Sequence, residues 1–209
     1  MEERLKTGTT TVGIVCKDGI IIAADKRATA GNLIVDKRAE KVHLINENMA
    51  VTIAGTVSDA QLLIKLIRAE LKLKEIRTNQ LPSMKESANL LGGLLYSNIR
   101  RPSMLPGIAH FLMAGKDKLG THLYDLFPDG SVTKVRDFIS SGSGSVFAYG
   151  VLESQYTPEI TIAEAIPLVT KAINTAIQRD SCSGNGLDVI TVTDKEIKKA
   201  LHKELITEL

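Results

Sequence analysis

An apolar run near the N-terminus constrains the fold of this chain more than any other feature. Residues 20–24 read Ile-Ile-Ile-Ala-Ala, with no polar position between them. A strand with one face in water alternates polar and apolar residues, so this run indicates a strand that is buried on both faces. A β-branched segment from Thr9 to Cys16 precedes it, and Lys17-Asp18-Gly19 supplies a turn. The chain is therefore predicted to open with a hairpin inside a covered sheet.

Further strands are predicted along the rest of the chain, separated by polar turns. They lie at residues 41–45, 49–53, 108–114, 121–126 and 189–193. The glycine- and serine-rich stretch 140–145 is expected to interrupt the sheet, and the charged residues 195–209 are expected to be partly helical.

Helical periodicity separates these groups of strands. Three capping-box sequences, which open at Ser58, Ser83 and Thr161, each precede apolar residues at helical spacing. A short helix is predicted at 147–153, and Pro167 is expected to kink the helix after Thr161, because proline lacks a backbone donor.

The order of elements is sheet, two helices, sheet, helices and strand. Helices grouped between sets of antiparallel strands fit two stacked sheets with a helical layer on each outer face. A length of 209 residues fits one domain. The predicted fold class is therefore α+β, as a four-layer αββα sandwich of two antiparallel sheets.

Composition argues against several classes of function. The net charge of +2 gives no basic field for nucleic acid, and no long uncharged apolar run predicts a membrane span. Residues 1–6 lack the apolar core of a signal peptide, and two distant cysteines, Cys16 and Cys182, suit a reducing compartment. The four histidines show no metal-ligand spacing. We expect a cytoplasmic protein with no metal, cofactor, nucleic-acid partner or membrane partner.

Thr9 follows Gly8 and precedes two more threonines, and it is a candidate nucleophile. On local sequence alone, an ordinary threonine at a strand start is the simpler interpretation. Catalysis requires Thr9 to become the first residue, because its α-amine, with a pKa of about 7.7–8.0, then accepts the hydroxyl proton. Residues 1–8 must then be removed, and Gly8 favours this because it has no Cβ to block attack on its carbonyl and adopts unusual dihedrals easily.

Three other candidates lie at predicted strand ends. Asp25 follows the buried run and Lys41 opens the next strand, so they are either exposed charges of little worth or a pair beside the nucleophile. In the second case Lys41 lowers the pKa of the hydroxyl and the amine near it, and Asp25 orients Lys41. Gly55 is either a tight strand-to-helix turn or a backbone donor for a developing oxyanion.

The polar turns at Ser143 and at 180–184 have ordinary loop composition. Their serines and glycines suggest a phosphate-binding nest, but they lack the lysine and the spacing of a P-loop. Nucleotide binding is therefore not expected.

Several of these segments together resemble the archaeal proteasome β subunits, over nearly the whole chain and in family order. The resemblance rests on Thr7-Gly8-Thr9-Thr10-Thr11-Val12-Gly13, Ala23-Ala24-Asp25-Lys26-Arg27-Ala28-Thr29, Ile53-Ala54-Gly55-Thr56, Ser141-Gly142-Ser143-Gly144-Ser145, Tyr149-Gly150-Val151-Leu152-Glu153 and Gln178-Arg179-Asp180-Ser181. It implies a sandwich of the N-terminal nucleophile hydrolase type, and peptide-bond hydrolysis by Thr9 through an acyl-enzyme ester.

The resemblance also implies roles for individual residues around Thr9. Asp25 and Lys41 match the acidic residue and the lysine that tune the nucleophile. Ser143, Asp180 and Ser183 match the polar group that holds the threonine amine and its proton-shuttling water.

Substrate-binding residues are implied in the same way. Gly55 matches the oxyanion donor, and Thr29 matches the residue that clamps the main chain of an extended substrate. The positions that match the pocket lining are small or apolar, and they are Ala28, Ala39, Ile53 and Val57. Such a lining favours cleavage after hydrophobic residues.

The implied organisation is a leader, residues 1–8, that the chain removes itself, and one catalytic domain, residues 9–209. The family assembles as stacked seven-membered rings in which α rings enclose β rings, and an ATP-dependent unfoldase feeds unfolded polypeptides through the α ring. Three alternatives stay open: a bacterial chamber protease with the same chemistry, a non-catalytic ring subunit that keeps its leader, and a small-molecule amidase. The sequences at 149–153 and 178–181 favour the archaeal or eukaryotic type over the bacterial one.

Overall fold

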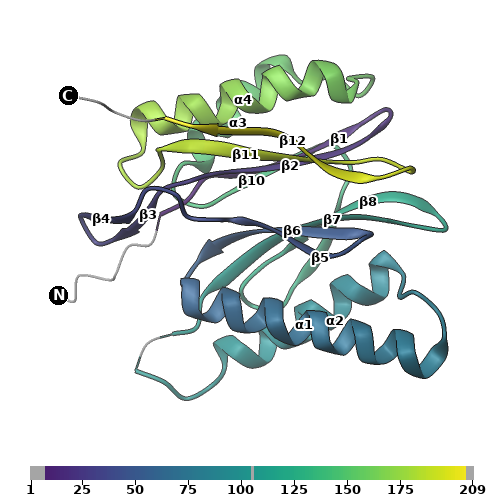
Figure 1. Cartoon of the computed structure of the whole chain (residues 1–209). Coiled ribbons are helices and arrows are strands. Elements are labelled where there is room, and N and C mark those ends of the chain that lie inside the picture. The colour runs from purple at the N-terminus through teal and green to yellow at the C-terminus, as the bar shows by residue number, and fades with distance from the viewer. Residues whose placement is uncertain (1–7, 105, 206–209) are drawn as a thin grey trace.

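The computed structural model describes residues 8–104 and 106–205, which form two five-stranded antiparallel sheets and a two-stranded hairpin. Figure 1 shows the two sheets stacked face to face, with a pair of helices over each outer face. This is the layered α+β sandwich that the sequence predicts, so the fold class is confirmed.

The first sheet has the strand order β10-β1-β2-β11-β12. Its strands are β1 (Thr11–Cys16), β2 (Gly19–Asp25), β10 (Phe138–Ser141), β11 (Gly186–Val192) and β12 (Ile197–Glu204). Its outer face is covered by α3 (Ser145–Gln155) and α4 (Ile162–Arg179).

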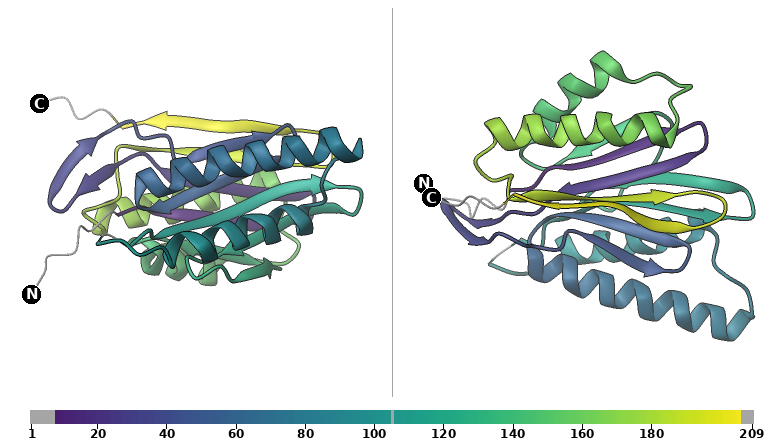
Figure 2. Two further views of the ribbon diagram at one scale, coloured as in Figure 1. Left: turned by 90° about the horizontal axis from the view of Figure 1, so that it is seen from below. Right: turned by 45° about the horizontal axis from the view of Figure 1, so that its top comes forward.

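The second sheet has the strand order β5-β6-β7-β8-β9. Its strands are β5 (Val42–Asn46), β6 (Met49–Gly55), β7 (Ala109–Asp117), β8 (Gly120–Leu126) and β9 (Val132–Val135). Its outer face is covered by α1 (Val57–Thr78) and α2 (Met84–Ile99). The separate hairpin consists of β3 (Ala28–Ala30) and β4 (Leu33–Asp36), and both views of Figure 2 place it at the end of the sandwich where the described chain begins.

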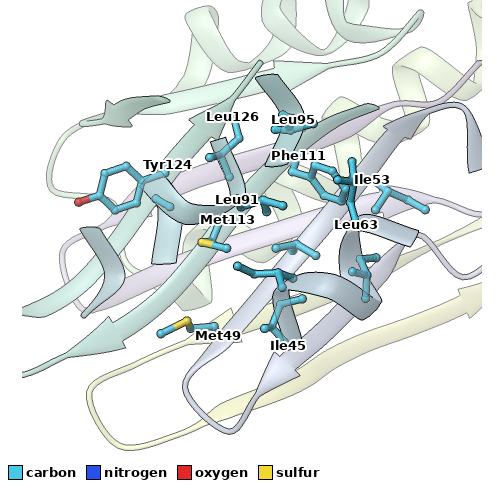
Figure 3. Close-up of a cluster of buried hydrophobic side chains, with 14 of the residues drawn as sticks. Ile45, Met49, Ile53, Leu63, Leu91, Leu95, Phe111, Met113, Tyr124 and Leu126 are labelled. Atoms are coloured by element: carbon cyan, nitrogen blue, oxygen red, sulfur yellow. The ribbon is translucent and has the colours of Figure 1, made fainter. Parts of the chain in front are cut away.

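Side chains alternate between two cores along the strands of the second sheet. Phe111 of β7 packs with Leu63 of α1 and Leu91 of α2 in the cluster of Figure 3, while its neighbour Leu112 belongs to the core between the sheets. Burying one such side chain stabilises the fold by about 1.5–3 kcal/mol. In β2 every residue is buried, which confirms the prediction from the apolar run.

Two of the three predicted helix caps are confirmed. The Ser83 hydroxyl accepts from the Glu86 N–H at 3.3 Å, and the Glu86 carboxylate accepts from the Ser83 N–H at 2.9 Å. Thr161 caps α4 in the same way, and α4 continues through Pro167 to Arg179. The predicted cap at Ser58 is wrong, because α1 already begins at Val57. The strand pairing ends one residue earlier, where the Thr56 N–H donates a hydrogen bond to the carbonyl of Ile108.

Three other predictions of local structure are corrected. The charged C-terminal segment is not helical where it is described, since β12 pairs with β11 along the edge of the sheet. The serine-rich stretch begins inside the sheet, because Ser140 and Ser141 pair with β1 as part of β10. The first strand begins at Thr11 instead of Thr9, and strands β3, β4, β9 and β10 were not predicted.

The leader predicted at residues 1–8 lies outside the described part of the chain, apart from Gly8. Cys16 and Cys182 are both free thiols. None of the helices within the described ranges has the length and apolarity to cross a membrane.

Candidate active site

Thr9 lies just before β1 and is buried, with 5% of its surface exposed. Its hydroxyl donates a hydrogen bond to the carbonyl oxygen of Gly8 at 2.7 Å. Its backbone N–H donates to the hydroxyl of Ser143 at 3.3 Å. The side chain therefore lies directly against the peptide bond that links it to Gly8.

Asp25 ends β2 and accepts four hydrogen bonds. One carboxylate oxygen accepts from the Lys41 ammonium at 2.7 Å and from the Thr10 N–H at 2.9 Å. The other accepts from the Gly184 N–H at 2.8 Å and the Arg27 N–H at 3.1 Å. A buried carboxylate requires such partners, and these four fix its position next to the segment that carries Thr9.

Lys41 lies just before β5, and its side chain is only 6% exposed. Burial lowers the pKa of Lys41, and the negative charges of Asp25 and Asp180 oppose this without cancelling it. A buried lysine with a lowered pKa is better suited to exchange a proton near neutral pH than an exposed one.

A second chain of hydrogen bonds reaches the backbone nitrogen of Thr9 through Ser143. The hydroxyls of Ser143 and Ser183 each donate to the same carboxylate oxygen of Asp180 at 2.6 Å. Ser183 also shares a hydrogen bond of 2.7 Å with the hydroxyl of Thr10. The six predicted catalytic residues thus lie in one group, because both chains meet at Thr9 and Thr10.

Two glycines allow the loop after β10 to approach this group. A side chain at Gly142, whose φ is +91°, would overlap the carbonyl oxygen of Thr9, and one at Gly144 would overlap the hydroxyl of Thr10. The Gly144 N–H donates to the Thr9 carbonyl at 3.4 Å. The glycine-serine stretch is therefore explained by close backbone approach.

Several of the residues predicted to bind substrate lie near residue 8 or in the segments that adjoin the group. The Thr29 hydroxyl accepts from the Gly8 N–H at 3.3 Å, and Ala28 precedes Thr29 in β3. The Ala39 N–H donates to the carbonyl of Lys26 at 3.0 Å. An extended substrate bound along Thr29, as the sequence predicts, would therefore pass beside residue 8.

The last three of these residues lie where β6 leads into α1. The Ile53 N–H donates to the carbonyl of Lys41 at 2.9 Å. Gly55 ends β6 with a φ of +108° and packs against the carbonyl of Ile108, and Val57 opens α1 with 45% of its surface exposed. The oxyanion role of Gly55 stays a prediction.

Three further residues of the site were missed from sequence. Thr10 contacts both Asp25 and Ser183, although it appeared to be only a strand residue. Arg27 donates to the Ser181 carbonyl at 2.9 Å, and Gly184 donates to Asp25. Arg27 and Gly184 act through contacts between distant segments, which no local pattern reveals.

The site contains a hydroxyl against a carbonyl, a buried amine and two carboxylates that orient the donors. This arrangement suits attack of the hydroxyl on an adjacent carbonyl carbon. Across residues 8–104 and 106–205, no three histidine, cysteine, aspartate or glutamate side chains gather in a group able to hold a metal ion.

Comparison with known proteins gives the family of this chain. The family described as "Proteasome subunit" matches residues 5–192. "Proteasome subunit beta" of Archaeoglobus fulgidus is 44% identical over 205 residues, covering 98% of this chain and 94% of the relative. The protein of the same name from Archaeoglobus profundus is 45% identical over 209 residues, covering 100% of this chain and 95% of the relative. The one from Methanothermobacter thermautotrophicus is 43% identical over 199 residues, covering 95% of this chain and 92% of the relative. With a match over nearly its whole length and a fold of the corresponding layers, the chain belongs to the proteasome β-subunit family.

Proposed function

We propose that this chain is a catalytic β subunit of the proteasome core particle, a threonine endopeptidase that becomes active when residues 1–8 are removed. The observation that carries the proposal is the 2.7 Å hydrogen bond from the Thr9 hydroxyl to the Gly8 carbonyl, next to a group of hydrogen-bonded polar side chains. An ordinary strand threonine needs neither the buried Lys41–Asp25 pair nor the Ser143–Asp180 chain beside it.

The first reaction is removal of the leader. The Thr9 oxygen attacks the carbonyl carbon of Gly8, and the hydroxyl proton is transferred to the nitrogen of Thr9 as the C–N bond breaks. The product is an ester between Gly8 and the Thr9 oxygen. Water hydrolyses this ester, which releases residues 1–8 with a carboxylate on Gly8 and leaves Thr9 with a free amine and hydroxyl.

The second reaction is hydrolysis of substrate by the processed chain. The free α-amine of Thr9, with a pKa of about 7.7–8.0, acts as the base near neutral pH. Ser143 holds this amine, as it holds the backbone N–H of the described chain, and Asp180 orients Ser143. The positive charge of Lys41 lowers the pKa of the hydroxyl and of the amine near it, which favours the ionised hydroxyl and the neutral amine.

The substrate is proposed to be an unfolded polypeptide that lies extended along Thr29. Small and apolar residues at Ala28, Ala39, Ile53 and Val57 favour a hydrophobic residue before the cleaved bond. The chain is proposed to act in the cytoplasm, in stacked seven-membered rings with other β subunits and with α subunits, fed by an ATP-dependent unfoldase.

The intact mass of the chain in its assembled form tests the proposal. Loss of residues 1–8 leaves 201 of the 209 residues (209 − 8). The Thr9→Ala variant is expected to assemble, keep all 209 residues and cleave no peptide. Thr78→Ala makes the same change at an exposed threonine of α1, and it is expected to process and cleave normally.

Two results would contradict the proposal. A leader retained in fully assembled wild-type rings would identify a structural subunit without catalysis. Peptidase activity that survives Thr9→Ala would assign the reaction to another nucleophile.

A further inference from the structure

Gly8 lies directly against the side chain of Cys182. A methyl group at position 8 would overlap the Cβ atom of Cys182, and it would lie 2.9 Å from both the Cys182 sulfur and the Ser143 hydroxyl oxygen. Real Cβ atoms essentially never approach another heavy atom within 3.0 Å. The space beside Gly8 therefore has no room for any side chain.

Cys182 cannot move aside by a change of rotamer. Rotation about its side chain moves the sulfur, whereas the Cβ atom is fixed by the backbone. The peptide group before Cys182 is held by two hydrogen bonds, because the Cys182 N–H donates to the Asp180 carboxylate at 3.2 Å and Arg27 donates to the Ser181 carbonyl at 2.9 Å. The Gly184 N–H adds a third bond, of 2.8 Å, to a carboxylate at the end of β2.

The displaced atoms would be those of the reacting bond. The carbonyl of Gly8 is the group that accepts from the Thr9 hydroxyl, so a shift of residue 8 separates the nucleophile from its target. A misplacement of about 1 Å in a reacting group can slow a reaction by about 100-fold.

We infer that Cys182 is a specificity-determining residue for self-cleavage, and that its Cβ atom restricts residue 8 to glycine. The inference rests on the self-processing proposed above. A substrate residue that carries a side chain must therefore bind with a backbone conformation different from that of Gly8, because a Cβ atom on the Gly8 backbone overlaps Cys182. The thiol has no part in this role, so any residue with a Cβ atom at position 182 imposes the same restriction.

The test follows loss of the leader by mass spectrometry in four variants. Gly8→Ala is expected to process about 100-fold more slowly than wild type. Gly8→Ala with Cys182→Gly is expected to recover to within about tenfold of wild type, because the obstructing Cβ atom is gone. Gly8→Ala with Cys182→Ser is the matched control, which keeps the Cβ atom and stays slow, and Cys182→Gly alone should process like wild type.

The outcomes separate this inference from the proposed function. A wild-type chain that never loses its leader refutes the proposed function. A wild-type chain that processes while Gly8→Ala processes equally fast refutes only the role of Cys182. A double variant that is no faster than Gly8→Ala, while Cys182→Gly alone is normal, also refutes it and assigns the glycine requirement to backbone freedom.

Alkylation of Cys182 decides the matter if Cys182→Gly alone fails to fold or process. Iodoacetamide should label Cys182 more slowly in the unprocessed Thr9→Ala chain than in the processed wild type, because Gly8 lies against the Cys182 side chain only before cleavage. Equal rates in the two forms would show that Gly8 does not lie against Cys182, and would overturn the inference.

Discussion

Replacing Asp25 by asparagine tests the reasoning about the buried group most directly. The substitution keeps the shape of the side chain and removes its charge, while the Lys41 ammonium, 2.7 Å away on a side chain that is only 6% exposed, stays in place. Removing one partner of a buried ion pair costs about 3–5 kcal/mol, because the remaining charge is neither paired nor hydrated. The new amide nitrogen replaces one of the two carboxylate oxygens, so it turns a donor toward either the Thr10 N–H or the Gly184 N–H, depending on which oxygen it replaces.

The assay is urea unfolding of the unprocessed Thr9→Ala chain, so that differences in processing do not affect the comparison. Asp25→Asn should lower the free energy of unfolding by about 3–5 kcal/mol. Glu159→Gln is the matched control, since Glu159 and Lys17 form an ion pair of 2.8 Å at side-chain exposures of 78% and 63%. It should cost less than about 1 kcal/mol.

A second variant identifies the cause of the loss. Asp25→Asn with Lys41→Met removes both charges and should recover part of the stability, because methionine fills similar volume without a buried ammonium. A loss at Asp25 no greater than that at Glu159 would refute the claim that burial sets the strength of this pair.

Three further predictions concern other parts of the molecule. Hydrogen bonds from Lys74 and Ser83 lower the pKa of Glu86 to about 2. The stabilising contribution of Glu86 is therefore complete above its ordinary pKa of 4.5 and is lost as the pH falls toward 2. Glu86→Gln should lower the free energy of unfolding at pH 7 in urea unfolding, and its difference from wild type should shrink at pH 3. Burial, with a smaller contribution from the charge of Asp18, raises the pKa of Cys16 to about 12, so iodoacetamide at pH 8 should leave Cys16 unlabelled by mass spectrometry until the chain is unfolded. Phe111→Ala should lower the free energy of unfolding by about 3–5 kcal/mol in the same urea assay, because the Phe111 side chain is fully buried between the second sheet and its helices. A loss under about 1 kcal/mol would show that this core is loosely packed.

Much of the fold could be predicted where one local cause dominates. The apolar run of β2 gives burial on both faces, and the caps at Ser83 and Thr161 mark helix starts because the bonds form within four residues. The helix start predicted at Ser58 was wrong, because only Thr56 separates the end of β6 from the start of α1. The charged segment of β12 resembled a solvated helix, but edge strands also carry charge, which limits pairing with other chains.

The site was less accessible to local reasoning. The local sequence around Asp25 and Lys41 is as compatible with two exposed charges as with a catalytic pair. Only the stacking of the two sheets buries the two side chains together. The family resemblance named six residues that the structure brings into one group. It gave no role to Arg27, which donates a hydrogen bond to Asn185, 158 positions away.

The sequence separation of these contacts has a consequence for the order of events during synthesis. Asp25 receives one of its four donors from Gly184, which is 159 positions later in the chain, and the nitrogen of Thr9 contacts Ser143, 134 positions later. Because a ribosome makes the N-terminal residues first, Thr9 emerges long before the segments that complete its surroundings. A chain that is truncated or only partly folded therefore lacks the complete site, so the self-cleavage proposed above would report that synthesis and folding of the chain are complete.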